Sequence, residues 1–438
     1  MAVRELIEIE DRHEIGTVMF SLIEEMFPIC RSITGDGVRQ TLDILKKIIP
    51  LEVIEIDTGT KVFDWTVPDE WNIKDAYIKN ARGEKIVDFK KLNLHVVNYS
   101  EPVRKKIGLS ELKNHCHTIP EHPEWVPYRT SYHNKTWGFC LSDKLFTSLE
   151  DEEYEVLIDS TLKPGSLSYG EYFIQGELDD EVLIYSHICH PSLCNDNLSG
   201  LAVASHLANC IKKSKPKYSY RFVFAPGTIG SITWLSQNEQ RLSRIKHGLV
   251  VALVGDSGCF TYKKSRIGNT EIDRAVLAAL KGCNNKYEVL EFSPYGYDER
   301  QFCSPGINLP VGRITRSPNG SYPEYHTSAD NLDFINKQSL ENSLSLCVDI
   351  INIIENNQCY KNTNPKCEPQ LGKRGLYQKT GGRKEIGLNE FALLWLLNYS
   401  DGEHDLLDIV EKSGLPFADI LLATDKLIQV GLLSDLDR

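Results

Sequence analysis

The chain has 438 residues, of which 41% are hydrophobic and 25% are charged, a composition typical of a soluble globular protein with more than one domain. Its formal net charge of −12 argues against nucleic acid or an anionic membrane as the main partner, because both are negatively charged. The longest apolar runs, such as GLVVALVG over 248–255, are too short to span a bilayer. These features exclude a membrane protein and disfavour a nucleic-acid-binding one.

The first residues, MAVRELIEIEDRHEIG, are charged throughout and lack the apolar core of a secretory signal. The twelve cysteines form no C-x-x-C pair and no regular framework, so we interpret them as reduced thiols. Together these observations predict a cytoplasmic location.

The segment from 11 to 48 is predicted to be helical. GTVMFSLIEEMF is amphipathic, CRSITGDG is typical of a turn, and VRQTLDILKKII repeats apolar residues with helical spacing. LEVIEID over 51–57 then alternates as a strand does. This order predicts the opening of an α/β domain.

Between 63 and 150, prolines, aromatic residues and short alternating runs replace the long periodic helices, which predicts a mostly β module. From 154 to 355 strands and helices alternate. The helices are expected at 197–213 and 336–356, and the strand candidates are YEVLIDSTL, YGEYFIQGEL, EVLIYSHI, SYRFVFAP, GLVVALVG and LPVGRIT. Apolar strands separated by helices predict a sheet that is covered on both faces.

A polar linker is predicted over 361–383, followed by three short helices over 384–438, the last beginning near Pro416. This pattern resembles a winged-helix unit. Residues 383–438 contain five Lys/Arg and eleven Asp/Glu, a net charge of −6, whereas a DNA-binding module needs positive charge to neutralise phosphates. We expect a packing module, or one that binds a protein partner or a second copy of the chain.

The stretch EVLIYSHICHPSLCNDNLSG contains two of the three candidate metal ligands. It places His187 at the end of an apolar strand and Asp196 just before a helix, and open parallel sheets bind ligands outside the carboxyl ends of their strands. A third candidate, His326, lies in YPEYHTSADNLDFI. Each residue alone has a structural explanation, such as helix capping for the aspartate, but imidazole and carboxylate together suit zinc.

The order of these motifs resembles that of the zinc aminopeptidases, the exopeptidase family that includes the glutaminyl-peptide cyclotransferases. In that family a histidine at a strand end, a bridging aspartate and a late histidine bind two metal ions; here these are His187, Asp196 and His326, and DERQFCSPGINLP over 298–310 also resembles the family. The resemblance implies a zinc-exopeptidase-like α/β fold, a mixed sheet between helices, formed by 1–62 and 151–360. Residues 63–150 would be an inserted lid-like β domain. More narrowly, the chain resembles bacterial proteins with an aminopeptidase-like domain, an inserted β domain and a C-terminal winged helix. The genes of these proteins are often found together with polysaccharide-biosynthesis genes.

The sequence departs from the family at the remaining ligands. Gly227 and Thr228 stand where the family has a Glu–Glu pair, Cys189 replaces an aspartate, and Asp256 is displaced from the end of its strand. The site therefore keeps three protein ligands, which is a normal number for catalytic zinc, and we expect one zinc rather than two. His190 is a candidate for a fourth ligand or a supporting group, and Cys189 for a packing residue, a ligand or a nucleophile.

A hydrolase also needs a group that takes a proton from water. Glu299 is the predicted base, with Asp298 and Asp256 behind it, although a surface charge cluster explains the letters DER equally well. Arg300, Arg313 and Arg316 are candidates for binding an anionic part of the substrate. The sequence predicts a zinc-dependent hydrolase of amide bonds that acts on a small, peptide or aminoacylated substrate. The alternative is a metal-containing binding protein of polysaccharide or cell-envelope biosynthesis.

Overall fold

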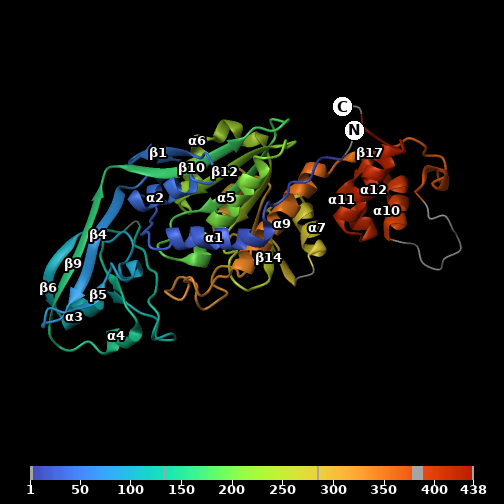
Figure 1. The fold of residues 1–438 in the computed structure, drawn as a ribbon. Helices are drawn as coiled ribbons and strands as arrows, with labels where there is room; N and C mark the ends of the chain where they lie inside the picture. Colours follow the sequence, from blue (N-terminus) through green and yellow to red (C-terminus); the bar gives the residue numbers. More distant parts are fainter. Residues whose placement is uncertain (1–2, 133, 284–285, 377–387, 437–438) are drawn as a thin grey trace. The chain divides into compact units, whose positions relative to one another are not determined.

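The computed structural model describes residues 3–132, 134–283, 286–376 and 388–436. The chain forms two compact units (Figure 1). The larger unit contains Ile9–Gly268 and Glu288–Leu344, and the smaller contains Met1–Glu8, Asn269–Tyr287 and Ser345–Arg438. Within the described ranges, no helix has the length and apolar character needed to cross a membrane.

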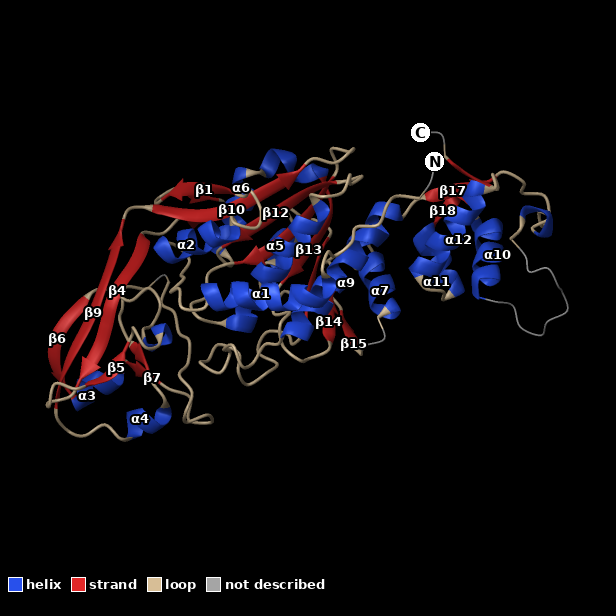
Figure 2. Cartoon of the chain, viewed as in Figure 1, coloured by secondary structure: helices blue, strands red, loops and turns tan. Residues whose placement is uncertain are grey.

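An eight-stranded sheet in the order β1-β10-β12-β11-β13-β16-β14-β15 forms the centre of the fold (Figure 2). Strand β11 is parallel to β12 and β13, and β13 is parallel to β16, whereas β1, β10 and β14 pair antiparallel with their neighbours. The predicted mixed α/β sheet is confirmed. Its strands are β1 (Glu52–Asp57), β10 (Ser166–Ile174), β11 (Glu181–His187), β12 (Ser219–Ala225), β13 (Ile245–Val251), β14 (Phe260–Lys263), β15 (Tyr287–Leu290) and β16 (Val311–Thr315).

Helices lie on both faces of this sheet (Figure 2). Every residue of β11 and β12 is buried, which explains why these strands are apolar without alternation. Leu183 and Tyr185 of β11 join a core cluster with Trp234 on one face. The helices around the sheet are α1 (Arg12–Met26), α2 (Asp36–Leu45), α5 (Gly200–Ile211), α6 (Ile229–Gln237), α8 (Glu299–Phe302) and α9 (Lys337–Asn356).

The inserted module has its own four-stranded sheet in the order β5-β4-β9-β6. Strand β9 pairs with β4 and β6, so this sheet continues past the boundary predicted at 150, because an apolar strand does not reveal from its sequence which sheet it joins. Its elements are β2 (Lys61–Val62), β3 (Trp65–Thr66), β4 (Glu70–Lys79), β5 (Lys85–Asp88), β6 (Val103–Gly108), α3 (Leu109–Asn114), β7 (Cys116–His117), β8 (Phe139–Cys140), α4 (Asp143–Thr147) and β9 (Glu153–Lys163).

The smaller unit contains α7 (Glu271–Gly282) and a three-stranded sheet in the order β18-β17-β19. Three helices accompany this sheet, and Pro416 directly precedes the last of them, as expected. Strand β17 lies before the predicted start at 384; residues 377–387 lie outside the described ranges. The elements are β17 (Cys359–Asn362), α10 (Leu388–Tyr399), β18 (Asp401–Asp405), α11 (Leu406–Ser413), α12 (Phe417–Gln429) and β19 (Leu433–Asp435).

A buried ion pair joins three neighbouring strands of the large sheet. Arg221 on β12 binds both carboxylate oxygens of Glu181 on β11, at 2.6 and 3.0 Å, and also pairs with Glu171 on β10. We expect Arg221→Met to lower the free energy of unfolding by about 3–5 kcal/mol, because it leaves Glu181 buried without its cation. Urea denaturation followed by circular dichroism measures this change.

The matched control is Lys106→Met, whose ion pair with Glu153 is about two-thirds exposed on both sides and contributes less than about 1 kcal/mol. Equal losses in the two variants would contradict the importance of the buried pair.

Candidate metal centre

The site forms where parallel strands end. Strand β11 ends at His187, which is in register with Ala225 at the end of β12. The loop that follows β11 returns to this edge and brings back His190 and Asp196, both buried. The carboxyl edge of the sheet is the usual ligand-binding position in this type of fold.

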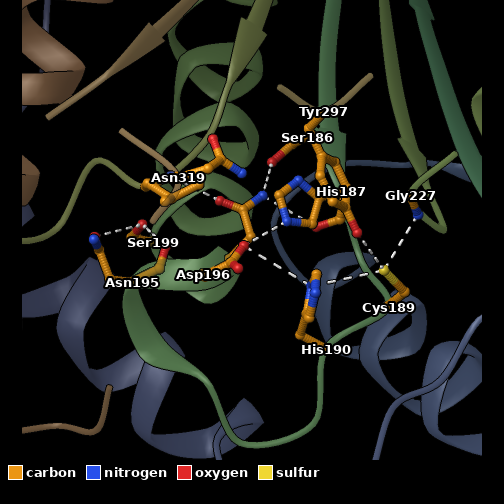
Figure 3. A network of polar contacts seen from close by, with 12 residues as sticks. Ser186, His187, Cys189, His190, Asn195, Asp196, Ser199, Gly227, Tyr297 and Asn319 are labelled. Atoms are coloured by element: carbon orange, nitrogen blue, oxygen red, sulfur yellow. Dashed lines mark hydrogen bonds and ion pairs between the residues drawn. The ribbon is translucent and has the colours of Figure 1, made fainter. Parts of the chain in front are cut away.

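Asp196 lies between histidines (Figure 3). One carboxylate oxygen is 2.7 Å from Nε2 of His187, and the other is 3.0 Å from Nε2 of His326. Nδ1 of His190 is 3.8 Å from the first oxygen. The ligand atoms of His187, His190 and Asp196 lie within 4.8 Å of one another, so these three residues form a set that can hold a metal ion.

The protein itself holds the Asp196 loop in place. The backbone N–H groups of Asn195 and Asp196 donate to the two oxygens of Asp330, at 2.6 and 3.0 Å. The Asn197 side chain donates to the carbonyl of His187 and accepts from the backbone N–H of Leu253. These bonds connect the loop to two strand ends and to the His326 loop, so the cluster is preorganised.

The protonation states also suit a metal. Burial works against ionisation of Asp196, but His190, His187 and His326 outweigh it and hold the pKa of the carboxyl well below its usual range. Burial lowers the pKa of His190 to about 3, although Asp196 opposes this shift. At neutral pH the cluster offers a carboxylate and a neutral imidazole, the forms that bind metals.

Two orphaned atoms lie beside the cluster. Nδ1 of His187 and one oxygen of Asp298 are buried without a hydrogen-bond partner among the described residues, while the other Asp298 oxygen accepts from the Thr228 N–H and the Ser231 hydroxyl. Burial raises the pKa of Asp298 to about 6, against the effect of His187. A metal-binding histidine usually donates its second N–H to a carboxylate, a carbonyl or water, and Asp298 supplies a carboxylate in this region. The donor set therefore fits zinc.

An aromatic ring occupies the space beside the missing Glu–Glu pair. A Cβ atom on Gly227 would lie 2.1 Å from the ring of Tyr297. That ring lies 4.2 Å from the ring of His187, and its hydroxyl is 3.3 Å from Cys189 Sγ. Cys189 in turn accepts from the Gly227 N–H. Tyr297 and Cys189 thus pack where the sequence lacks carboxylates.

The structure does not bring Glu299, the predicted base, to the histidines. Glu299 is buried, and one of its oxygens lies 2.7 Å from Lys263 and 3.4 Å from Arg313. Burial opposes its ionisation, but Arg313 and Lys263 outweigh burial and hold the pKa below its usual range. No described contact joins Arg300 to the cluster, and Arg316 binds the Gly258 carbonyl and lies over the Phe260 ring.

A cavity of about 280 Å³ opens onto the cluster. Sequence reasoning missed Tyr297 in its wall and Arg31 behind it, whose Nε donates to the carbonyl of His190 at 2.8 Å. Arg31 lies in the turn CRSITGDG and Tyr297 directly precedes the stretch 298–310, but nothing in these stretches indicates that either residue reaches the cluster. The cavity is lined by Ile33, Trp65, Tyr128, Thr130, Tyr132, His190, Gly227, Thr228, Ile229, Tyr297 and His326.

The inserted module contributes directly to this wall. The Tyr128 N–H donates to the carbonyl of His326 at 2.7 Å, and the Ser328 N–H donates to the carbonyl of Val126 at 2.8 Å. Tyr128 also meets the rings of His190 and His326 edge-on. His133 of the same module lies outside the described residues.

The sheet and the position of its ligand edge define an aminopeptidase-like α/β fold. A zinc aminopeptidase from Bacillus subtilis aligns with a TM-score of 0.57 at 14% identity, over 80% of this chain and 95% of that one. A peptidase M28 precursor from Shewanella amazonensis aligns with a TM-score of 0.54 at 13% identity, over 79% and 95%. The fold expected from the sequence resemblance is confirmed.

The chain belongs to the family described as a domain of unknown function, DUF4910, whose model matches residues 20–357, and a winged helix-turn-helix model matches 358–435. A protein from Clostridium acetobutylicum, named for polysaccharide biosynthesis and an aminopeptidase-like domain, is 56% identical over 97% of this chain and 98% of its own length. A crystal structure from the same organism, named provisionally as a peptidase, aligns with a TM-score of 0.93 at 54% identity over 98% of both chains.

The packing of Tyr297 on Gly227 can be tested by a double-mutant cycle. We expect Gly227→Ala to lower the free energy of unfolding by about 1–3 kcal/mol, because the new methyl group meets the tyrosine ring. Tyr297→Ala in the same chain removes that clash, so the two effects should be strongly non-additive. Thermal unfolding of the two single variants and the double variant gives the coupling.

Gly306→Ala is the control, because a Cβ atom at Gly306 meets nothing within 4 Å. Simple additivity of the Gly227 and Tyr297 substitutions would mean that the ring does not fill this space.

Proposed function

We propose that this chain is a zinc-dependent hydrolase of amide bonds. The observation that carries the proposal is the buried Asp196 carboxylate, which has a histidine at each oxygen and His190 nearby. The fold shared with zinc aminopeptidases and the cavity over the cluster support it.

His187, His190 and Asp196 would hold the metal, because their ligand atoms lie close together. Bound zinc polarises a carbonyl group and lowers the pKa of water. Asp330 and Asn197 keep Asp196 in position through the hydrogen bonds of the loop, and Arg31 fixes the backbone at His190. The chain's own residues thus bind the ion and orient the side chains around it.

We assign the proton-accepting role to His326 rather than to Glu299. His326 lines the cavity, its side chain is 28% exposed, and Nε2 faces Asp196. When Nε2 carries the hydrogen, Nδ1 is free to accept a proton from water, as a histidine oriented by a carboxylate does in general base catalysis. Glu299 is neutralised by Lys263 and Arg313. This assignment replaces the ligand role that the sequence predicted for His326.

Measurements of metal content and turnover distinguish a metal-binding role from a proton-accepting role. For protein purified without a nickel column, we expect about one zinc per chain, by analogy with three-ligand catalytic sites, and loss of zinc in Asp196→Ala and His190→Ala. His326→Ala should keep its zinc but lose about 10²–10⁴-fold in kcat, the usual contribution of a general base. Mass spectrometry of the metal and hydrolysis of small amides measure the two effects.

His206→Gln is the control, because His206 is a buried histidine outside the cluster and its replacement should leave zinc content unchanged. Loss of zinc in His326→Ala would instead make His326 a ligand. Wild-type protein that binds no zinc would overturn the metal centre, and zinc without turnover of any amide would favour the alternative of a metal-containing binding protein.

For the winged-helix unit we infer a packing role rather than DNA binding, although such units often bind DNA. Arg274 of α7 pairs with Asp405, Asp408 and Glu411, at 3.1, 2.9 and 2.7 Å, so the acidic start of α11 is held within this unit. Helix α12 carries Asp419 and Asp425, which would repel phosphates.

A DNA mobility shift tests this inference. At physiological salt we expect no shift of duplex DNA at protein concentrations up to about 10 µM, within the range where non-specific binders already associate. The Asp419→Lys/Asp425→Lys double variant reverses the charge of α12 and serves as the comparison. A salt-sensitive shift with the wild type would contradict the packing role.

A further inference from the structure

Among the described residues, no aspartate, glutamate, lysine or arginine side chain lines the cavity. Its lining consists of tyrosines, tryptophan, isoleucines, threonines, a glycine and two of the three histidines around Asp196, His190 and His326. A substrate group that enters this cavity exchanges water for neutral surroundings. Burial of a charge without an opposite charge is unfavourable.

From this charge distribution we propose that the site takes an uncharged, N-acylated amide, specifically the acetamido group of an N-acetylated amino sugar, and disfavours substrates with a free α-ammonium group. The inference rests on the proposed hydrolase function and specifies its substrate. It differs from the aminopeptidase reaction that the fold alone suggests.

The acidic groups near the cavity lie behind its wall. Asp196 faces the histidines, Asp330 accepts two backbone N–H groups, and Asp298 accepts from Thr228 and Ser231. All three are fully buried. None of the three lines the cavity, so an ammonium group there would meet no carboxylate at the wall.

A buried cation adds to this effect. Arg31 is 1% exposed, and its hydrogen bonds go to the carbonyls of His190 and Met26 and to the hydroxyl of Thr41. Its remaining nitrogen, Nη2, has no hydrogen-bond partner among the described residues. A guanidinium without a carboxylate, directly behind His190, makes the region less favourable for a second positive charge.

The size and chemistry of the wall fit a single sugar ring. A volume of about 280 Å³ is just below the usual range for drug-sized ligands. The hydroxyls of Tyr128 and Tyr132 lie 2.6 Å apart, and Trp65 offers an aromatic surface. Neutral hydroxyls and aromatic faces can bind the hydroxyls, the amide and the apolar face of a sugar. The Clostridium acetobutylicum relative is itself named for polysaccharide biosynthesis.

The reaction is a hydrolysis and needs no other reactant. Water adds across the C–N bond of the acetamido group, its oxygen bonds to the acyl carbon, and the C–N bond breaks. His326 takes the proton from water and returns it to the leaving nitrogen, so the products are acetate and an amino sugar. The released amine takes up a proton and becomes an ammonium ion. The cavity wall has no carboxylate that would hold this ion.

The test compares two amides on the full-length, zinc-loaded protein. Acetate release from the methyl glycoside of N-acetylglucosamine is measured beside ammonia release from leucine amide, which carries a free ammonium. We expect kcat/KM to be at least 100-fold higher for the acetamido sugar. A higher value for leucine amide would overturn this inference but leave the hydrolase intact, whereas turnover of neither amide with zinc bound would overturn both.

A matched pair of variants isolates charge from shape. Thr130 lines the cavity and is exposed, so both substitutions should be tolerated. Thr130→Asp adds a carboxylate and should raise kcat/KM for leucine amide, relative to that for the acetamido sugar, about tenfold. Thr130→Asn introduces a side chain of the same shape as Asp but without the charge, and should not raise it. Equal effects of the two substitutions would show that the wall does not select by charge.

Discussion

The sharing of one buried carboxylate by two histidines is the constraint on which the site depends. Asp196 can stay ionised away from water because His187 and His326 meet its oxygens and because Asp330 holds its backbone. A buried charge is stable only when its partners and hydrogen bonds are complete. Strand ends, the loop after β11 and the late loop at His326 must therefore reach their positions together, and the sheet provides that framework.

Much of the fold could be read from the sequence because its signals are local. The apolar strands of the sheet and the long helix α9 follow periodic patterns, and the histidine–aspartate motif lies at a strand end as predicted. The strand β9 was predicted, but the sheet to which it belongs was not, and β17 was not predicted, because each pairs with segments far away in the chain. In the site, His187, Asp196 and His326 were named and are brought together. The role of His187 and Asp196 as ligands stays a prediction, and for His326 we propose a different role. Glu299 was predicted to be a base from the charged triplet 298–300. Its partner Lys263 lies 36 residues earlier in the chain, so the sequence does not reveal the ion pair.

Tyr297 and Cys189 pack where the resemblance to zinc aminopeptidases leads one to expect carboxylates, and on the proposed function this affects more than the number of metal ligands. Acidic groups at the edge of a sheet attract cations and make a polar, hydrated mouth. Here the edge beside Gly227 is filled by an aromatic ring in contact with His187. Charges act more strongly on one another where apolar groups take the place of water and polar groups. That is why the unpaired guanidinium of Arg31 matters for the chemistry of the cavity.

The backbone ladder between residues 126–128 and 326–328 has a consequence for how this protein is assembled. These segments are joined by three backbone and side-chain hydrogen bonds, yet about 200 positions of chain separate them. Contacts of such sequence separation close late, since the entropy of a long loop must be overcome first. The backbone of the His326 loop thus has these hydrogen bonds only while the inserted module is packed against it. A chain without the inserted module would therefore lose one wall of the cavity, formed by Tyr128, Thr130 and Tyr132, together with the backbone partners of the His326 loop.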